Sequence, residues 1–90
     1  MSQYRFKMLT PKGTLVDEEV VSIVAPGEAG YFGVLANHAP LIATLTSGDL
    51  RVTTASGDRW YKVEGGIFRV AKNSAVLLSE SIEESAAPSE

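Results

Sequence analysis

Turn-forming residues recur at short intervals along the whole chain, and this spacing restricts the fold more than any other feature. The turn signals stand at Pro11-Lys12-Gly13, Pro26-Gly27, Gly30, Ser47-Gly48-Asp49, Ser56-Gly57-Asp58, Gly65-Gly66 and Lys72-Asn73-Ser74. Such residues favour the backbone angles of tight turns. Between them, no window of helical length carries apolar residues at the i, i+3, i+4 spacing of an amphipathic helix. Helix bundles and doubly wound α/β folds are therefore excluded.

The segments between the turns have the patterns of β-strands. Apolar and polar residues alternate in some of them, and the others are short runs of branched or aromatic residues: residues 4–8, 20–25, 50–54, 60–64, 67–70 and 75–78. The segments flanking Ser56-Gly57-Asp58 and Lys72-Asn73-Ser74 are predicted hairpins. Short strands with a turn about every 8–12 residues are typical of a sandwich or barrel. We predict one all-β domain over residues 1–82 and an acidic, mobile tail over residues 83–90.

Composition excludes several classes of function. The 90 residues contain no cysteine and one histidine, so a disulfide framework is impossible and a zinc site built by the protein is not expected. The formal net charge is −3, and the basic residues are scattered singly. Nucleic acid is bound mainly through clustered positive charge, so no nucleic-acid partner is expected. The first ten residues lack the apolar run of a signal peptide.

A long uncharged segment runs from Ala29 to Gly48, without a Lys, Arg, Asp or Glu. Its length would cross a bilayer, but it contains Asn37, His38 and Pro40, together with helix-breaking glycines. Direct membrane insertion is therefore not expected. Exposed apolar surface with a polar rim usually marks a contact with another protein. The residues alone indicate an interaction domain and not an enzyme.

A catalytic histidine and an aromatic ligand-binding surface are two alternative kinds of site. His38 as a general base would need a carboxylate or nucleophile nearby, and no acid lies between Glu28 and Asp49. A structural role or a place at the rim of an interface remains open for His38. Trp60 and Tyr61 follow Arg59 and keep open a β-sandwich ligand-binding module without enzymatic activity.

The charged and glycine-rich stretches do not have the patterns of catalytic or phosphate-binding sites. Asp17, Glu18 and Glu19 read as a solvated turn, and the glycines of PGEAGYFG lack the lysine and helix of a phosphate-binding loop. At Gly65-Gly66 we expect a tight turn or a close backbone approach.

Residues 21–52 resemble the signature region of the epsilon subunit of rotary ATP synthases, which is called delta in mitochondria. Within this region the matching pieces are Pro26-Gly27, Gly30, Phe32-Gly33-Val34-Leu35 and His38-Ala39-Pro40-Leu41. Later in the chain, Val63-Glu64-Gly65-Gly66-Ile67-Phe68-Arg69-Val70 and Ala75-Val76-Leu77-Leu78 resemble two further segments of the family. They occur in the family's order and spacing over residues 3–82.

The resemblance implies a β-sandwich of about ten strands and a place in the central stalk. Such a subunit is a non-catalytic part of the rotor: it grips the gamma subunit and rests on the membrane ring of c subunits (the c-ring). It passes ring rotation, driven by protons or sodium ions, to gamma and so to ATP synthesis. The resemblance implies no cofactor or metal, a monomer within the complex, and a peripheral position on the cytoplasmic face of a bacterial energy-transducing membrane.

The resemblance also assigns contacts to individual residues. The implied c-ring contacts are Gly27, Glu28, Ala29, Gly30 and Tyr31. The implied gamma contacts are His38, Ala39, Leu41, Ile42, Ala43 and Asp49. Many family members carry Glu where this chain has Tyr31, so either Glu28 substitutes for that acid or the ring contact is aromatic.

The end of the chain gives a further expectation. Typical bacterial members continue into a two-helix C-terminal domain, whereas this sequence ends at Glu90. We therefore expect no inhibitory helical arm and no ATP site of the kind that such an arm carries.

Overall fold

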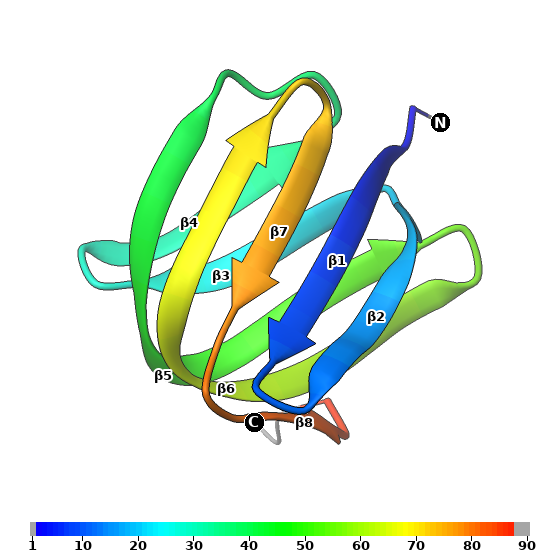
Figure 1. The fold of residues 1–90 in the computed structure, drawn as a ribbon. Helices are drawn as coiled ribbons and strands as arrows, with labels where there is room; N and C mark the ends of the chain where they lie inside the picture. The colour runs from blue at the N-terminus through cyan, green and yellow to red at the C-terminus, as the bar shows by residue number, and fades with distance from the viewer. Residues whose placement is uncertain (1, 88–90) are drawn as a thin grey trace.

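The computed structural model describes residues 2–87, and these residues form eight strands and no helix (Figure 1). The strands are β1 (Tyr4–Thr10), β2 (Gly13–Val20), β3 (Ser22–Gly27), β4 (Gly30–Leu35), β5 (Leu41–Thr54), β6 (Gly57–Ala71), β7 (Ser74–Leu78) and β8 (Ile82–Ser85). The predicted all-β class is confirmed.

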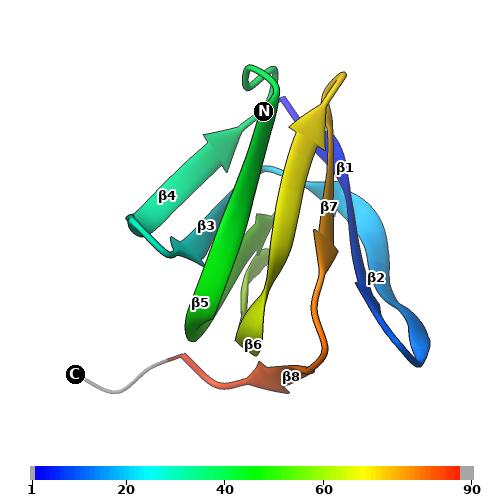
Figure 2. The ribbon, with the colours of Figure 1, turned by 60° about the vertical axis from the view of Figure 1, so that its left-hand side comes forward.

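All the strands belong to one sheet that folds over on itself. Its order is β2-β1-β7-β6-β5-β3-β4, with β8 paired to β6. Strands β5 and β6 are long and curved, so that β1, β2 and β7 lie on one side while β3 and β4 lie on the other (Figures 1 and 2). Neighbouring strands are antiparallel except β1 and β7, which are parallel. The long pair β5–β6 thus contributes to both layers of the sandwich.

The number of strands is lower than the ten predicted, because two predicted turns are not turns. Ser47-Gly48-Asp49 lies inside β5, and Gly65-Gly66 lies inside β6. The β5–β6 ladder is interrupted only between the pairs Leu45–Gly66 and Ser47–Glu64, and it resumes in the same register. Gly65 and Gly66 have φ angles of 71° and 129°. At these two glycines β6 bends from one layer into the other, and the strand continues without a turn.

Both predicted hairpins are present. Thr54 pairs with Gly57 across the β5–β6 turn, and Ala71 pairs with Ser74 across the β6–β7 turn. In the second turn, Lys72 and Asn73 have φ angles of 52° and 58°. Two positive φ angles belong to the two-residue type I′ turn that matches strand twist.

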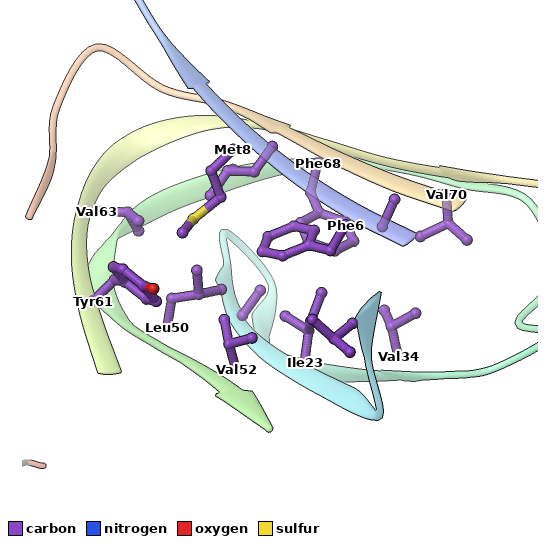
Figure 3. Close-up of a cluster of buried hydrophobic side chains, with 14 of the residues drawn as sticks. Phe6, Met8, Ile23, Val34, Leu50, Val52, Tyr61, Val63, Phe68 and Val70 are labelled. Carbon is purple, nitrogen blue, oxygen red and sulfur yellow. The ribbon is translucent and has the colours of Figure 1, made fainter. Parts of the chain in front are cut away.

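The core lies between the two layers, where alternate side chains of facing strands meet. The largest fully buried side chains include Phe6, Met8, Ile23, Leu50 and Phe68 (Figure 3). The ring of Phe68 lies 6.1 Å from that of Phe6, between centroids. Strands β1 and β3 therefore each turn one apolar face inward, as period-2 alternation predicts.

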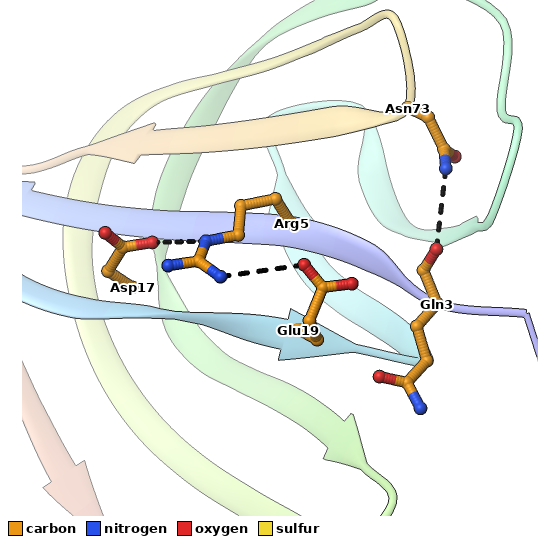
Figure 4. Close-up of polar contacts among 5 residues, drawn as sticks. All are labelled: Gln3, Arg5, Asp17, Glu19 and Asn73. Carbon is orange, nitrogen blue, oxygen red and sulfur yellow. Dashed lines mark hydrogen bonds and ion pairs between the residues drawn. The ribbon is translucent and has the colours of Figure 1, made fainter.

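The acidic run Asp17–Glu19 is not a turn: it forms part of β2. The Arg5 Nε atom lies 2.6 Å from Asp17 Oδ1, and Arg5 Nη1 lies 3.7 Å from Glu19 Oε2 (Figure 4). The hydrogen bond from Arg5 holds the pKa of Asp17 below its ordinary value of 3.8. Glu18, on the other face of the strand, pairs with Arg59. Asp17 and Glu19 thus face Arg5 on the neighbouring strand β1, whereas Glu18 pairs with Arg59 of β6, which is not adjacent to β2 in the sheet. Sequence separation concealed both contacts.

Strand β8 carries the sheet three residues past the expected boundary at residue 82. Lys62 pairs with Glu83, and Trp60 with Ser85, in the β6–β8 ladder. The last three residues of the predicted tail, 88–90, lie outside the described residues. The mobility expected of the tail stays a prediction.

Candidate functional site

A groove of about 590 Å³ lies between the β3–β4 turn and the first half of β5. Its lining holds all five predicted ring contacts, Gly27 to Tyr31, and three predicted gamma contacts, His38, Leu41 and Ala43; the other lining residues are Phe32, Gly33 and Thr44. We call this hollow the groove. The fold therefore brings the two predicted contact segments to one surface.

The β3–β4 turn that forms one wall of the groove is firmly attached. Gly27 pairs with Gly30, so Glu28 and Ala29 form a two-residue turn between the strands. The Glu28 N–H donates to the carbonyl oxygen of Thr44 at 3.1 Å, which joins the turn to β5. Phe32 packs beneath, with its ring edge-on to Phe68 at 5.6 Å between centroids. The wall is thus fastened both to a neighbouring strand and to the core.

Tyr31 is exposed, with 61% of its surface accessible to solvent. Its hydroxyl oxygen accepts a hydrogen bond from the Asp49 backbone N–H at 3.3 Å. The aromatic side chain therefore leans toward β5 and connects a predicted ring contact to a predicted gamma contact.

His38 lies on an exposed loop at the edge of the groove. Its Nδ1 atom lies 2.7 Å from the Ala39 carbonyl oxygen, so Nδ1 carries the proton that it donates there. The preceding Asn37 donates its N–H to Asn73 Oδ1 at 2.6 Å, which ties the loop to the β6–β7 turn. Within residues 2–87, no group of three or more His, Asp or Glu side chains could hold a metal ion. The contacts of His38 are those of a structural group at a rim.

The six predicted gamma contacts do not share one face. Successive residues of a strand point to opposite sides, so Ile42 points away from Leu41 and Ala43. Leu41 and Ala43 are half-buried, whereas Ile42 is 73% exposed and Ala39 is also exposed. Asp49 is held by Lys62, whose Nζ lies 3.1 Å from Asp49 Oδ1.

Ile42 belongs to an apolar area that the sequence analysis missed. Ile67 and Leu78, each about half exposed, are paired across β6 and β7, and Ile67 is the diagonal neighbour of Ile42 across β5 and β6. We call Ile42, Ile67 and Leu78 the outer patch. The sequence carried a partial signal: residues 75–78 are apolar at outward as well as inward positions, which is typical of strands covered on both faces, whereas residues 67–70 have Ile67 and Arg69 at their outward positions.

The aromatic pair of the ligand-binding alternative is split by the fold. Tyr61 is 2% exposed and belongs to the core, where burial raises the pKa of its hydroxyl. It cannot stack on a ligand. Trp60 is half-buried on the opposite face, with the Arg51 guanidinium carbon 5.9 Å from its ring centroid.

No helix among the described residues is long and apolar enough to span a membrane.

The fold and its surface define a small β-sandwich domain whose exposed apolar residues gather at a groove and on one outer face. A family model described as "ATP synthase, Delta/Epsilon chain, beta-sandwich domain" matches residues 3–85. The chain belongs to this family of ATP synthase subunits.

Relatives in bacteria carry the name ATP synthase epsilon chain. The protein of Chlorobium limicola is 36% identical over 80 residues, which cover 88% of this chain and 91% of the relative. That of Bartonella henselae is 33% identical over 82 residues, which cover 91% of this chain but 59% of the relative. The chain thus spans nearly the whole of one relative and about three-fifths of the other.

Solved structures show the same fold. A chain in the cryo-EM structure of the Euglena gracilis mitochondrial ATP synthase superposes with a TM-score of 0.87 and 22% identity, over 93% of this chain and 54% of that one. A chain of the central stalk and c-ring of the Tetrahymena thermophila enzyme superposes with a TM-score of 0.74 and 16% identity, over 87% and 63%.

Proposed function

We propose that the chain is a non-catalytic subunit of the central stalk, which couples ion-driven rotation of the c-ring to the gamma subunit and so to ATP synthesis. Family membership supports a place in the ATP synthase. The observation that carries the coupling role is the groove, because it unites the segments predicted to touch the ring and gamma. The chemistry of ATP synthesis belongs to other subunits, and this chain supplies a mechanical link.

The β3–β4 turn is the proposed ring contact. Glu28, Ala29 and Gly30 are exposed at the tip of the turn, and Tyr31 is exposed beside them. The hydrogen bond from Glu28 to Thr44 fastens the tip to β5. A load applied at the turn is thereby passed to the longest strand pair of the sandwich, which runs through both layers.

The proposed gamma contact begins at the groove, with His38, Leu41 and Ala43, and continues around β5 onto the outer patch. Ile42 is the most exposed large apolar side chain that the structure describes. Covering it together with Ile67 and Leu78 removes apolar area from water, which favours association. His38, Leu41 and Ala43 line the groove. Ala39, just before β5, and Asp49, further along β5, remain proposed contacts outside its lining.

The proposed position is peripheral, on the cytoplasmic face of a bacterial energy-transducing membrane, and the chain acts there as a monomer within the complex. Its partners are proteins, and no cofactor is proposed.

The proposal can be tested by ATP-driven ion pumping in vesicles that contain the ATP synthase of the same organism. Complexes assembled without this chain should hydrolyse ATP with little pumping, and adding the chain should restore pumping. Ile42→Asp should restore it poorly, because a charge would be buried against gamma. Leu15→Asp, at an exposed apolar residue of β2, is the matched control and should restore it fully. Equal pumping with and without the chain would contradict the proposal.

A further inference from the structure

A second hollow, of about 340 Å³, lies on the outer face of the layer that contains β3 and β4. Leu50 and Val52 are buried in the core, so Arg51 between them points to this outer face. In the sheet, Arg51 pairs with Val24 of β3 on one side and with Trp60 of β6 on the other. The lining residues are Val24, Tyr31, Asp49, Arg51 and Trp60. We call it the Arg51 hollow, because Arg51 lies on the middle strand of its floor.

Arg51 carries a positive charge that no described residue neutralises. The ion pairs among residues 2–87 have Arg5, Arg59 and Lys62 as their basic partners. The Arg51 Nε atom is buried and has no hydrogen-bond partner in this part of the chain. A guanidinium offers five N–H groups in a planar fork that suits a carboxylate, and leaving such a donor buried without an acceptor is costly. Arg51 is therefore a donor group that an incoming oxyanion would stabilise.

The other charges at the hollow limit which anion fits. Asp49 lies two residues before Arg51 on β5 and points to the same face. Its Oδ1 atom lies 3.1 Å from Nζ of Lys62, the residue opposite it on β6. The Asp49–Lys62 pair is neutral as a whole, so the lining together with Lys62 carries one net positive charge. A monoanion is thus favoured, whereas the second charge of a dianion such as sulfate is repelled by the Asp49 carboxylate.

The uncharged part of the lining is apolar and aromatic. The Arg51 guanidinium carbon lies 5.9 Å from the Trp60 ring centroid, and cation–π attraction at this distance holds the guanidinium at the hollow. Val24 is half-buried, and the Tyr31 side chain is exposed. These surfaces suit the CH₂ groups of a ligand, so the fitting carboxylate is one carried on a short apolar stem.

We infer that the Arg51 hollow binds a single carboxylate on a short apolar stem, with the Arg51 guanidinium as the hydrogen-bond donor and the Trp60 ring as one wall. A glutamate side chain of a partner protein and a small free organic acid share this chemistry. This inference does not rest on the proposed function, and either can fail while the other stands.

The test uses the full chain labelled with ¹⁵N and follows the Arg51 Nε–H and Trp60 indole N–H signals by NMR, at about pH 6.5 and constant ionic strength. The probes are isocaproate, a free carboxylate, and acetyl-Ala-Glu-Ala-amide, a carboxylate within a peptide; both are ionised at this pH. At least one should shift the two signals with saturation, at a half-saturating concentration of about 10 mM or less. The neutral probes isocaproamide and acetyl-Ala-Gln-Ala-amide should not. Sulfate should bind at least about threefold more weakly than the better carboxylate.

Three variants locate the site, with the Trp60 signal as the common readout. Arg51→Gln should weaken binding at least about tenfold, because it removes the charge and the fork of donors. Arg51→Lys keeps the charge without the fork, so its affinity should fall between those of wild type and Arg51→Gln. Arg69→Gln removes the same charge from an exposed arginine of β6 on the other layer, and it should bind within about twofold of wild type. Circular dichroism should show that each variant is folded.

The two carboxylate probes separate the sources of the ligand. Saturable shifts from the tripeptide alone would assign the site to an acidic side chain of a protein, and shifts from isocaproate alone would assign it to a free acid. The absence of a saturable shift with either carboxylate would overturn the inference, and so would unchanged binding by Arg51→Gln. Tighter binding of sulfate than of both carboxylates would overturn the preference for a monoanion.

Discussion

At the scale of single residues, Tyr4 shows how one side chain joins the two layers. It lies on β1, is 2% exposed, and donates its hydroxyl to the Val34 carbonyl oxygen of β4 at 2.7 Å. The two residues are 30 positions apart in the sequence. The bond therefore joins β1 in one layer to β4 in the other, two strands that are not neighbours in the sheet.

Removing this hydroxyl should destabilise the fold. We expect Tyr4→Phe to lower the free energy of unfolding by about 1–2 kcal/mol, because the Val34 carbonyl loses a buried partner. Urea unfolding followed by the fluorescence of Trp60, the single tryptophan, would measure it. Tyr31→Phe removes an exposed hydroxyl and should cost less than about 0.5 kcal/mol. Equal losses from the two variants would contradict a special role for Tyr4.

The same residue predicts a dependence of stability on pH. Burial raises the pKa of Tyr4 above its ordinary value of 10.0. Its stabilising contribution is complete below about pH 10, and it is lost at higher pH because the unfolded chain releases the proton first. Stability should therefore fall above pH 10, and Tyr4→Phe should show a smaller fall. Tyr61, whose pKa is also raised, keeps the effect from vanishing.

At the scale of elements, the bend of β6 at Gly66 makes the sandwich possible. A Cβ atom at Gly66 would lie 2.3 Å from the Leu78 carbonyl oxygen, which is the close backbone approach expected from the sequence. Strand β7 therefore packs directly against the backbone of β6 at the place where β6 changes layers.

Substitution at this bend should be severe. Gly66→Ala combines a positive φ angle with contact against a backbone that cannot move freely. Gly57→Ala is the matched control, because Gly57 has a φ angle of 121° but nothing within 4 Å of the added Cβ. Thermal or urea unfolding should show Gly66→Ala to be less stable than Gly57→Ala by at least about 2 kcal/mol. A smaller loss at Gly66 than at Gly57 would contradict this account of the bend.

The sequence predicted the hairpin turns correctly, but it could not distinguish a turn that ends a strand from a bend within a strand. The hairpin at Lys72-Asn73 was predictable because residues of two alternating strands flank a short turn that favours positive φ angles. Ser47-Gly48-Asp49 and Gly65-Gly66 carry the same residue types, but long-range pairing of β5 with β6 keeps both segments extended. A glycine indicates that a position can adopt unusual backbone angles. It does not indicate whether the chain turns there or continues as a bent strand.

The sequence indicated which segments line the groove, but not which faces of the strands are exposed. The groove unites segments whose importance the uncharged run and the family motif had indicated. The division between Leu41 and Ile42 required the observed strand, because a one-residue step along β5 reverses the face. Ile67 and Leu78 were hidden because an apolar residue in a short strand reads equally well as core or as surface.

At the scale of the whole molecule, the domain carries two exposed apolar surfaces on one continuous sheet. The groove lies beside the β3–β4 turn, and the outer patch crosses β5, β6 and β7. Both include residues of β5, so the longest hydrogen-bonded pair of strands connects them.

Because the sequence contains no cysteine, single cysteines can report which proteins contact the chain in the complex. Single cysteines can be placed at Glu28 in the turn, at Ile42 in the outer patch, and at Leu15 on β2. Each variant is assembled into the ATP synthase of the same organism and treated with a thiol-specific photo-crosslinker. We expect a product with the c subunit from Glu28→Cys, a product with gamma from Ile42→Cys, and neither product from Leu15→Cys. Complexes that contain the chain but yield neither a ring product from Glu28→Cys nor a gamma product from Ile42→Cys would contradict the proposed function.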